Sequence, residues 1–344
     1  MIRNLVYAPL SQAFSAAVKI RERVYSRGLI STFSVGVPVI SVGNITVGGT
    51  GKTPTVDFFL RHFGKLGIKV GVVSRGYRSR NAGPTLVTAE GRDLSFCATE
   101  FGDEPTMIKW RNPDVPVVIG RDRVKACKLL LGRNSGVQCI LADDAFQHWR
   151  LKRDLDIVVL DATENPESYE YLPLGRAREG FESLARAHFI LINKTNLGSS
   201  KNIEFLMNKV KNFKSSSILK FQYRITGLRG LKSGELQNDL RARKYYIVSG
   251  IGRSVTFRAL LQNDLGIEIV GEFQFPDHFS YEINSIQKVM MEARKSGADR
   301  ILMTEKDAVK FQRWAHDEFL YSELEMVPEL SLEHFDGQVS SLLR

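Results

Sequence analysis

The sequence predicts an α/β protein with a mostly parallel sheet flanked by helices and a second, smaller α/β lobe. The first observation is a series of short apolar segments that read as buried strands, at residues 38–45, 69–74, 115–119, 137–141, 155–160 and 189–192. The second is the helical spacing of apolar residues between them, as at Val56, Phe59, Leu60 and Phe63. Strands that alternate with helices are typical of βαβ units, which build parallel sheets.

A glycine-rich segment, VGNITVGGTGKTP, lies between the first strand and the first helix of this series. It matches the phosphate-loop pattern G-x-x-x-x-G-K-[ST] except at its first position, where Thr46 replaces glycine. Bare glycine backbone can surround a phosphate, the lysine neutralises terminal phosphates and the hydroxyl can bind magnesium. The segment therefore predicts a nucleotide-binding fold of the P-loop type, with a site formed by Thr46, Val47, Gly48, Gly49, Thr50, Gly51, Lys52 and Thr53.

The second lobe is predicted from strands near residues 217–223, 245–249 and 267–273 and from helices near residues 256–265 and 281–296. The polar stretch 227–243 reads as a connection or a hairpin. We expect three parts: an N-terminal segment (residues 1–30), a P-loop lobe with the nucleotide site (31–215), and a C-terminal lobe that contributes to the active-site cleft (216–344).

Acidic residues follow several of the predicted strands. Asp143 and Asp144 end an apolar strand, where P-loop enzymes carry the carboxylates that hold magnesium; a solvated turn is the alternative interpretation. Together with Thr53 they form the predicted metal site. Asp103 and Glu104, just before a proline, read first as the start of a helix. His278 in "FPDHF" and the segment "TEKDAVK" (residues 304–310) receive no function from the residues alone.

The segment "LINKTN" resembles the guanine-reading N-K-x-D element of GTPases. A regulatory or metal-delivery GTPase is therefore an alternative. The segment ends in Asn196 where that element has an aspartate, so the guanine ring would lack its acidic acceptor. This substitution argues against the alternative.

The net charge of +10 indicates an anionic partner. The N-terminal segment combines basic residues (Arg3, Lys19, Arg21, Arg23 and Arg27) with apolar residues at helical spacing. We expect either an amphipathic helix on an anionic membrane surface or a helix packed on the protein. Its apolar run is too short to span a bilayer, and no secretory cleavage site follows it.

Other classes of partner find little support. A nucleic-acid-binding ATP switch is a third hypothesis, but no nucleic-acid motif is recognisable, so we expect no nucleic acid. No obligate protein partner is evident. Three cysteines without C-x-x-C spacing indicate buried thiols in a reducing compartment, not a disulfide framework or a zinc cluster.

Seven segments in order resemble the tetraacyldisaccharide 4′-kinase family, the lipid A 4′-kinases of Gram-negative bacteria. They are "SVGNITVGGTGKTP", "SRGY", "GDEP", "DDAFQH", "LPLGRARE", "FPDHF" and "TEKDAVK", and the resemblance runs from the N-terminal segment to about Lys310. It implies a kinase that uses ATP and Mg²⁺ to phosphorylate the 4′-hydroxyl of a tetraacylated glucosamine disaccharide 1-phosphate, forming lipid IVA. It also implies that the enzyme acts at the cytoplasmic face of the inner membrane, to which it is attached peripherally or through its N-terminus.

The resemblance also implies roles for individual residues. Asp103 matches the family's catalytic aspartate and His278 its supporting histidine, with Lys52 as a third catalytic group. Asp143 and Asp144 match the carboxylates near magnesium. Arg75, Glu104, Arg178 and Glu179 are candidates for contacts with substrate or phosphate. Thr46 follows the family's pattern, whereas Arg176 stands where an apolar residue is more usual.

Overall fold

The protein is represented by a computed structural model that describes residues 2–81, 83–214, 218–251 and 254–344. The predicted boundary between residues 215 and 216, and the predicted strand start at residue 217, lie outside the described residues. The strands are β1 (Val39–Asn44), β2 (Val70–Ser74), β3 (Thr85–Leu86), β4 (Val117–Ile119), β5 (Cys139–Asp143), β6 (Leu155–Asp161), β7 (Phe189–Asn193), β8 (Ile218–Gly230), β9 (Lys244–Ser249), β10 (Glu268–Gln274), β11 (Arg300–Met303) and β12 (Phe319–Pro328).

The helices alternate with these strands over most of the chain. They are α1 (Ile2–Ser26), α2 (Lys52–Lys65), α3 (Leu94–Phe101), α4 (Asp103–Arg111), α5 (Arg123–Arg133), α6 (Ser200–Lys214), α7 (Ser254–Leu260), α8 (Ile283–Lys295), α9 (Glu305–Phe311) and α10 (Glu333–Leu342). Among the described residues, no helix is long and apolar enough to cross a bilayer.

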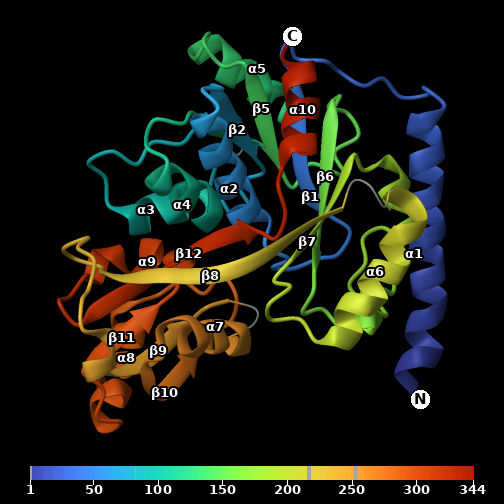
Figure 1. The fold of residues 1–344 in the computed structure, drawn as a ribbon. Helices are drawn as coiled ribbons and strands as arrows, with labels where there is room; N and C mark the ends of the chain where they lie inside the picture. The colour runs from blue at the N-terminus through green and yellow to red at the C-terminus, as the bar shows by residue number, and fades with distance from the viewer. Residues whose placement is uncertain (1, 82, 215–217, 252–253) are drawn as a thin grey trace.

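One sheet runs through the molecule in the order β10-β9-β11-β12-β8-β7-β6-β1-β5-β2-β4-β3. Within the described ranges, neighbouring strands are parallel except for the pairs β8–β12 and β3–β4. This confirms the predicted α/β class with a mostly parallel sheet. The strand β8 pairs with β7 on one edge and with β12 on the other, and both long strands cross between the two parts of the molecule (Figure 1).

Helices cover both faces of the P-loop part of the sheet. Alternate strand residues face opposite sides, so Val72 packs in the core cluster of α2, whereas Val73 packs in the cluster of α5. The helix α10 lies on the same face as α2, and the rings of Phe59 and Phe335 are 4.7 Å apart. The sheet is therefore buried on both faces, which explains the continuous apolar runs of its central strands.

Several element predictions need correction. The strand predicted at residues 137–141 is displaced, because β5 runs from Cys139 to Asp143 and ends in a carboxylate. The stretch predicted as a polar connection begins inside β8, which continues to Gly230. The sequence analysis also missed β11, β12, α6 and α10. In β8, buried and more exposed residues alternate, so its solvent-facing polar residues break up the apolar signal.

Candidate active site

The glycine-rich segment forms a turn between β1 and α2, as the sequence predicts. Gly48 and Gly51 have φ angles of 107° and 91°, a backbone conformation that suits glycine, and Gly51 is the N-cap of α2. A side chain at Gly48 would collide with the guanidinium of Arg176, and one at Gly51 with Tyr223 and Asn193. The N-terminus of α2 thus points out of a tightly enclosed loop, which is the arrangement that binds phosphate.

Side chains behind the loop hold its shape. Asn193 at the end of β7 donates its amide N–H to the carbonyl of Thr50 at 2.6 Å, and Asn44 at the end of β1 donates to the Thr50 hydroxyl at 2.7 Å. All three residues are buried. Asn44 and Asn193 were not among the predicted site residues. Their position, at the carboxyl ends of buried strands beside the loop, is the signal that could have found them.

Thr46, which replaces the first glycine of the pattern, is buried and forms an isolated bridge with Ala177. Beside it, the backbone N–H of Val47 donates to the carbonyl of Arg176 at 2.8 Å. The segment "LPLGRARE" therefore runs along the entrance of the phosphate loop. The Arg176 side chain closes over Gly48 and pairs with the buried carboxylate of Glu164 at 3.0 Å.

The two strand-end aspartates occupy different surroundings. Asp143 is buried, accepts a hydrogen bond from the Ser74 hydroxyl at 2.8 Å, and its Oδ1 atom has no hydrogen-bond partner. Burial, together with the negative charges of Glu104 and Asp144, raises the pKa of Asp143 to about 6. Asp144 lies 2.8 Å from Arg178 and 3.6 Å from Lys52. Burial would raise its pKa, but Lys52 and Arg178 outweigh burial and hold that pKa below its ordinary value.

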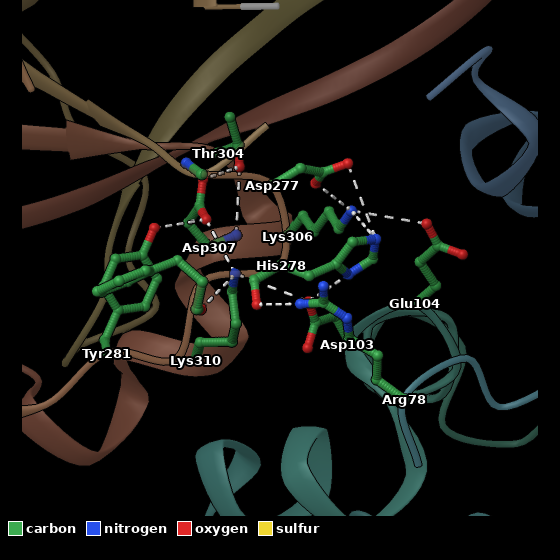
Figure 2. Close-up of polar contacts among 12 residues, drawn as sticks. Arg78, Asp103, Glu104, Asp277, His278, Tyr281, Thr304, Lys306, Asp307 and Lys310 are labelled. Atoms are coloured by element: carbon green, nitrogen blue, oxygen red, sulfur yellow. Dashed lines mark hydrogen bonds and ion pairs between the residues drawn. The ribbon is translucent and has the colours of Figure 1, made fainter. Parts of the chain in front are cut away.

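The structure brings Asp103 and His278 together, although they are far apart in the sequence. Asp103 is the first residue of α4, and His278 lies in the loop between β10 and α8, with a φ angle of 60°. The distance from His278 Nδ1 to Asp103 Oδ2 is 3.0 Å (Figure 2). The Arg78 guanidinium donates to the backbone carbonyl of His278 at 2.9 Å and so fixes the loop.

Two lysines of α9 adjoin this pair. Lys310 Nζ lies 3.7 Å from Asp103 Oδ2, and Lys306 Nζ lies 3.3 Å from His278 Nε2. Burial alone would raise the pKa of Asp103, but the His278 hydrogen bond and the charges of Lys310 and Lys306 hold that pKa below its ordinary value. The Asp103 carboxylate is therefore ionised at neutral pH.

A cavity connects the phosphate loop with the C-terminal lobe; we call it the P-loop cavity. Lys52 and Thr53 line one side, and Asp277 and Lys306 line the other. Glu104 also lines this cavity. Because Glu104 and Asp277 are the chain neighbours of Asp103 and His278, the Asp103–His278 pair lies next to the cavity.

A second cavity, the basic cavity, lies between α1 and the P-loop lobe. The predicted contact residues Arg75 and Arg178 both line it, together with Arg21, Arg121, Arg123, Asp144 and the apolar residues Phe14, Val18 and Leu172. Arg123 is buried, and it donates to the carbonyls of Gly120 and Asp143 at 2.7 and 3.2 Å. The cavity combines several guanidinium groups with an apolar wall.

Glu179 does not line either cavity itself, although its chain neighbour Arg178 lines the basic cavity. It is buried, and its carboxylate pairs with Arg186 and with Arg21 of α1. It therefore connects α1 to the P-loop lobe in this structure. A contact of Glu179 with substrate stays a prediction.

The GTPase alternative finds no support in the geometry of "LINKTN". Asn196 donates its side-chain N–H to the carbonyl of Tyr223 at 2.8 Å and accepts the backbone N–H of Tyr223 at 3.0 Å. Lys194 pairs with the buried Asp161 at 2.5 Å. Asn196 thus joins the segment after β7 to β8, and Lys194 joins it to the end of β6, so both side chains are already engaged.

Comparison with known proteins gives the same family throughout the chain. The family model of tetraacyldisaccharide-1-P 4′-kinase matches residues 3–343. The tetraacyldisaccharide 4′-kinase of Bdellovibrio bacteriovorus is 36% identical over 311 residues, which cover 90% of each chain. That of Shewanella loihica is 34% identical over 344 residues, covering 99% of this chain and 91% of the relative.

A solved structure shares the whole fold. The crystal structure of LpxK from Aquifex aeolicus in complex with ATP superposes with a TM-score of 0.78 at 27% identity, and the match covers 100% of both chains. The family match therefore extends from sequence to architecture. On this evidence the chain belongs to the tetraacyldisaccharide 4′-kinase family.

Proposed function

We propose that this chain is an ATP-dependent kinase that phosphorylates the 4′-hydroxyl of a tetraacylated glucosamine disaccharide 1-phosphate and so forms lipid IVA in lipid A biosynthesis. Its family membership supports the activity. The structural observation that carries the proposal is the pairing of Asp103 with His278 beside the P-loop cavity. This places a candidate proton acceptor from one lobe and its partner from the other next to the phosphate loop.

ATP would enter the P-loop cavity with its phosphates at the N-terminus of α2. The backbone N–H groups of the glycine-rich loop and the Lys52 ammonium would receive the phosphate oxygens. Lys52 lies 3.6 Å from Asp144 and can exchange that carboxylate for a phosphate. Apolar and aromatic residues also line this cavity and suit a nucleobase; they include Leu197, Tyr223, Phe257 and Leu260.

The residues Thr53, Asp143 and Asp144 fit a magnesium ion. Magnesium prefers oxygen ligands and commonly binds one or two carboxylates together with substrate phosphates. The Oδ1 atom of Asp143 is buried without a hydrogen-bond partner, and the raised pKa of this carboxyl reflects burial beside other negative charges. A bound cation would compensate both. When present, magnesium would neutralise charge on the phosphate oxygens of ATP.

Asp103 would receive the proton of the attacking sugar hydroxyl. As the 4′-oxygen forms its bond to the γ-phosphorus, the bond from that phosphorus to the β–γ bridging oxygen breaks and ADP leaves. The hydroxyl proton passes to the Asp103 carboxylate, which His278 orients through its hydrogen bond. A weak base suffices because phosphoryl transfer depends chiefly on positioning and charge neutralisation.

The basic cavity would receive the anionic sugar 1-phosphate. Arg75 and Arg178 line it together with three further arginines, and guanidinium groups bind phosphate in a bidentate manner. Phe14, Ala17 and Val18 of α1 line the same cavity. Charge for the phosphate and apolar surface for acyl chains are thus adjacent.

The helix α1 would lie on the anionic cytoplasmic face of the inner membrane. Five of its exposed apolar residues recur at helical spacing and form a stripe, which we call the α1 stripe: Val6, Leu10, Ala13, Ala17 and Ile20. More than half of the Val6, Leu10 and Ile20 side chains is exposed. The opposite side of α1 is attached to the protein: Ser11 donates to the carbonyl of Tyr171 at 2.8 Å, and Tyr25 stacks on Trp149. Both interpretations of the N-terminal helix thus have support.

The proposed activity is tested by incubating the protein with labelled ATP, Mg²⁺ and a tetraacyl disaccharide 1-phosphate in detergent micelles. We expect label in the lipid, less with GTP as donor, and none with Lys52→Ala, which removes the charge in the phosphate loop. Hydrolysis of GTP in preference to ATP, without a lipid product, would refute the proposal.

A further inference from the structure

The segment "TEKDAVK" lies in the active site, although the sequence gives it no function. It follows β11 and forms α9, with Thr304 as the N-cap whose hydroxyl accepts the N–H of Asp307 at 3.2 Å. The Asp307 carboxylate is buried and receives hydrogen bonds from the Tyr281 hydroxyl, the Thr304 hydroxyl and the Gly250 N–H. This network fixes α9 and therefore the side chains that α9 directs at Asp103 and His278 (Figure 2).

Three acceptor atoms surround the ammonium group of Lys306. They are Asp277 Oδ1 at 3.1 Å, His278 Nε2 at 3.3 Å and Glu104 Oε1 at 3.6 Å (Figure 2). An ammonium group has three N–H donors and no acceptor. The contacts with Asp277 and His278 are within hydrogen-bond distance, and the contact with Glu104 is an ion pair. Burial alone would lower the pKa of Lys306, but Glu104 and Asp277 outweigh burial and raise it, so the side chain stays charged.

The contact with Lys306 determines where the imidazole proton lies. Asp277 Oδ2 also lies near Nε2 of His278, but at 3.8 Å it is beyond hydrogen-bond distance. Because Lys306 can only donate, Nε2 presents its lone pair to Lys306. A neutral imidazole has one N–H, which must then be on Nδ1. Nδ1 is the atom 3.0 Å from Asp103 Oδ2, so the N–H points at the carboxylate. A second proton on Nε2 would place a donor against the Lys306 ammonium.

The geometry also selects one oxygen of Asp103. Both the His278 N–H and the Lys310 ammonium, which is 3.7 Å away, approach Oδ2. The Oδ1 atom is then the oxygen that can face the acceptor hydroxyl. Orientation of this carboxylate thus depends on the tautomer of His278.

We propose that Lys306 is a positioning residue that holds His278 as the Nδ1–H tautomer, so that His278 donates its N–H to Asp103. The proposal rests on the role proposed above for Asp103 and adds a third group to the pair. Lys306 comes from α9, Glu104 from α4 and His278 from the loop after β10, so the arrangement forms only when the two lobes meet.

The tautomer can be measured directly by ¹⁵N NMR of protein labelled at its six histidines. The signal of His278 is assigned from the resonance that disappears in His278→Gln. We expect a protonated Nδ1 and an unprotonated Nε2 at neutral pH in the intact protein without substrate. An Nε2–H tautomer or a doubly protonated ring would overturn the proposal before any change at Lys306 is made.

Variants of Lys306 test whether this residue holds the tautomer of His278. Lys306→Met removes the donor, and we expect the single Nδ1–H tautomer to be lost. Lys306→Arg keeps a group that only donates, so the tautomer should persist. Lys295→Met is the matched control, because Lys295 is an exposed lysine of the same lobe with one acidic neighbour at 3.0 Å. An unchanged His278 spectrum in Lys306→Met would contradict the proposal, and Lys306→Leu, which also lacks a donor, serves if that variant unfolds.

Turnover provides a second readout. With both substrates saturating, we expect Lys306→Met to lower kcat by roughly 10- to 100-fold, below the loss typical of an acid–base group itself. Lys306→Arg should retain most of kcat, and Lys295→Met all of it. A normal kcat in Lys306→Met, or no rescue by arginine when the tautomer is restored, would overturn the proposal. If the intact protein formed no lipid product, only the proposed function would fail, because the NMR measurement needs no substrate.

Discussion

Asp103 has two roles: it begins a helix, and it is the proposed proton acceptor. It begins α4 at the positive end of the helix, which is the interpretation that the residues alone favour. The same position places its carboxylate 3.0 Å from His278, which is 175 residues away in the sequence. No local pattern indicates such a pairing. Only the family resemblance pointed to it, because proximity between lobes is a property of the folded chain.

Replacement of either member of the pair should chiefly affect turnover. We expect Asp103→Ala and His278→Ala each to lower kcat by roughly 10²- to 10⁴-fold, the range for a positioned acid–base group. The measurement is the initial rate of lipid phosphorylation at saturating ATP and lipid. The controls are His316→Ala and Asp317→Ala, which change exposed residues of the C-terminal lobe and should leave kcat unchanged. Normal turnover in the Asp103 and His278 variants would leave Asp103 with its structural role alone.

The elements differ in how well the sequence predicts them. The P-loop, its strand and α2 follow from glycine conformation and apolar spacing, which act over a few residues. The strand β12 was missed, and its partner β8 was not recognised at full length, since β8 alternates buried and more exposed residues. The pairing of β8 with β12 joins segments about a hundred residues apart. The sequence therefore predicted the local elements of the site but not the ribbon that brings the lobes together.

The proposed membrane binding of α1 can be tested by placing a charge on its exposed face. Leu10→Asp places a carboxylate in the α1 stripe, whereas Gln12→Asp adds the same charge to an exposed position outside it. Because burial of a leucine contributes about 1.5–3 kcal/mol, we expect Leu10→Asp to weaken binding to anionic vesicles by roughly tenfold or more. Gln12→Asp should weaken it less. Vesicle flotation measures both, and equal losses would show that charge repulsion alone is responsible.

At the scale of the whole molecule, Arg111 of α4 connects three elements. Its guanidinium pairs with Glu305 of α9 at 2.9 Å and with Asp57 of α2 at 3.4 Å, and it donates to the carbonyl of Leu324 in β12. The Glu305 and Asp57 side chains are buried. The sequence does not indicate the roles of Glu305 and Asp57, because a buried ion pair has no local sequence pattern. This contact joins the two lobes, and Arg111 and Glu305 both line the P-loop cavity.

Glu305 makes stability depend on pH. Burial raises its pKa to about 7 from an ordinary value of 4.5, and Arg111 offsets burial only in part. Between these values the folded protein binds more protons at Glu305 than the unfolded protein does, so the free energy of unfolding falls as pH rises. We expect Glu305→Gln, which has no carboxyl group to titrate, to remove this part of the slope, which amounts to about 3 kcal/mol between the two pKa values.

Urea unfolding at about pH 5 and about pH 8, without nucleotide, measures this effect. The control is Glu325→Gln, a more exposed glutamate that pairs with Arg61 at 3.1 Å and should leave the difference between the two pH values in place. If Glu305→Gln retains the full difference, another group is responsible.

The position of β12 in the sheet determines the order in which parts of this protein can form during translation. It lies between β11 and β8, although residues 319–328 leave the ribosome after all the other described strands. Before then, the strands of the C-terminal lobe have no hydrogen-bonded connection through β12 to the rest of the sheet. The helix with the α1 stripe, in contrast, is made before every described strand. A nascent chain would thus carry the α1 stripe before β12 joins the two lobes, and a chain stopped short of β12 would have the stripe without the paired strands that bring Asp103 and His278 together.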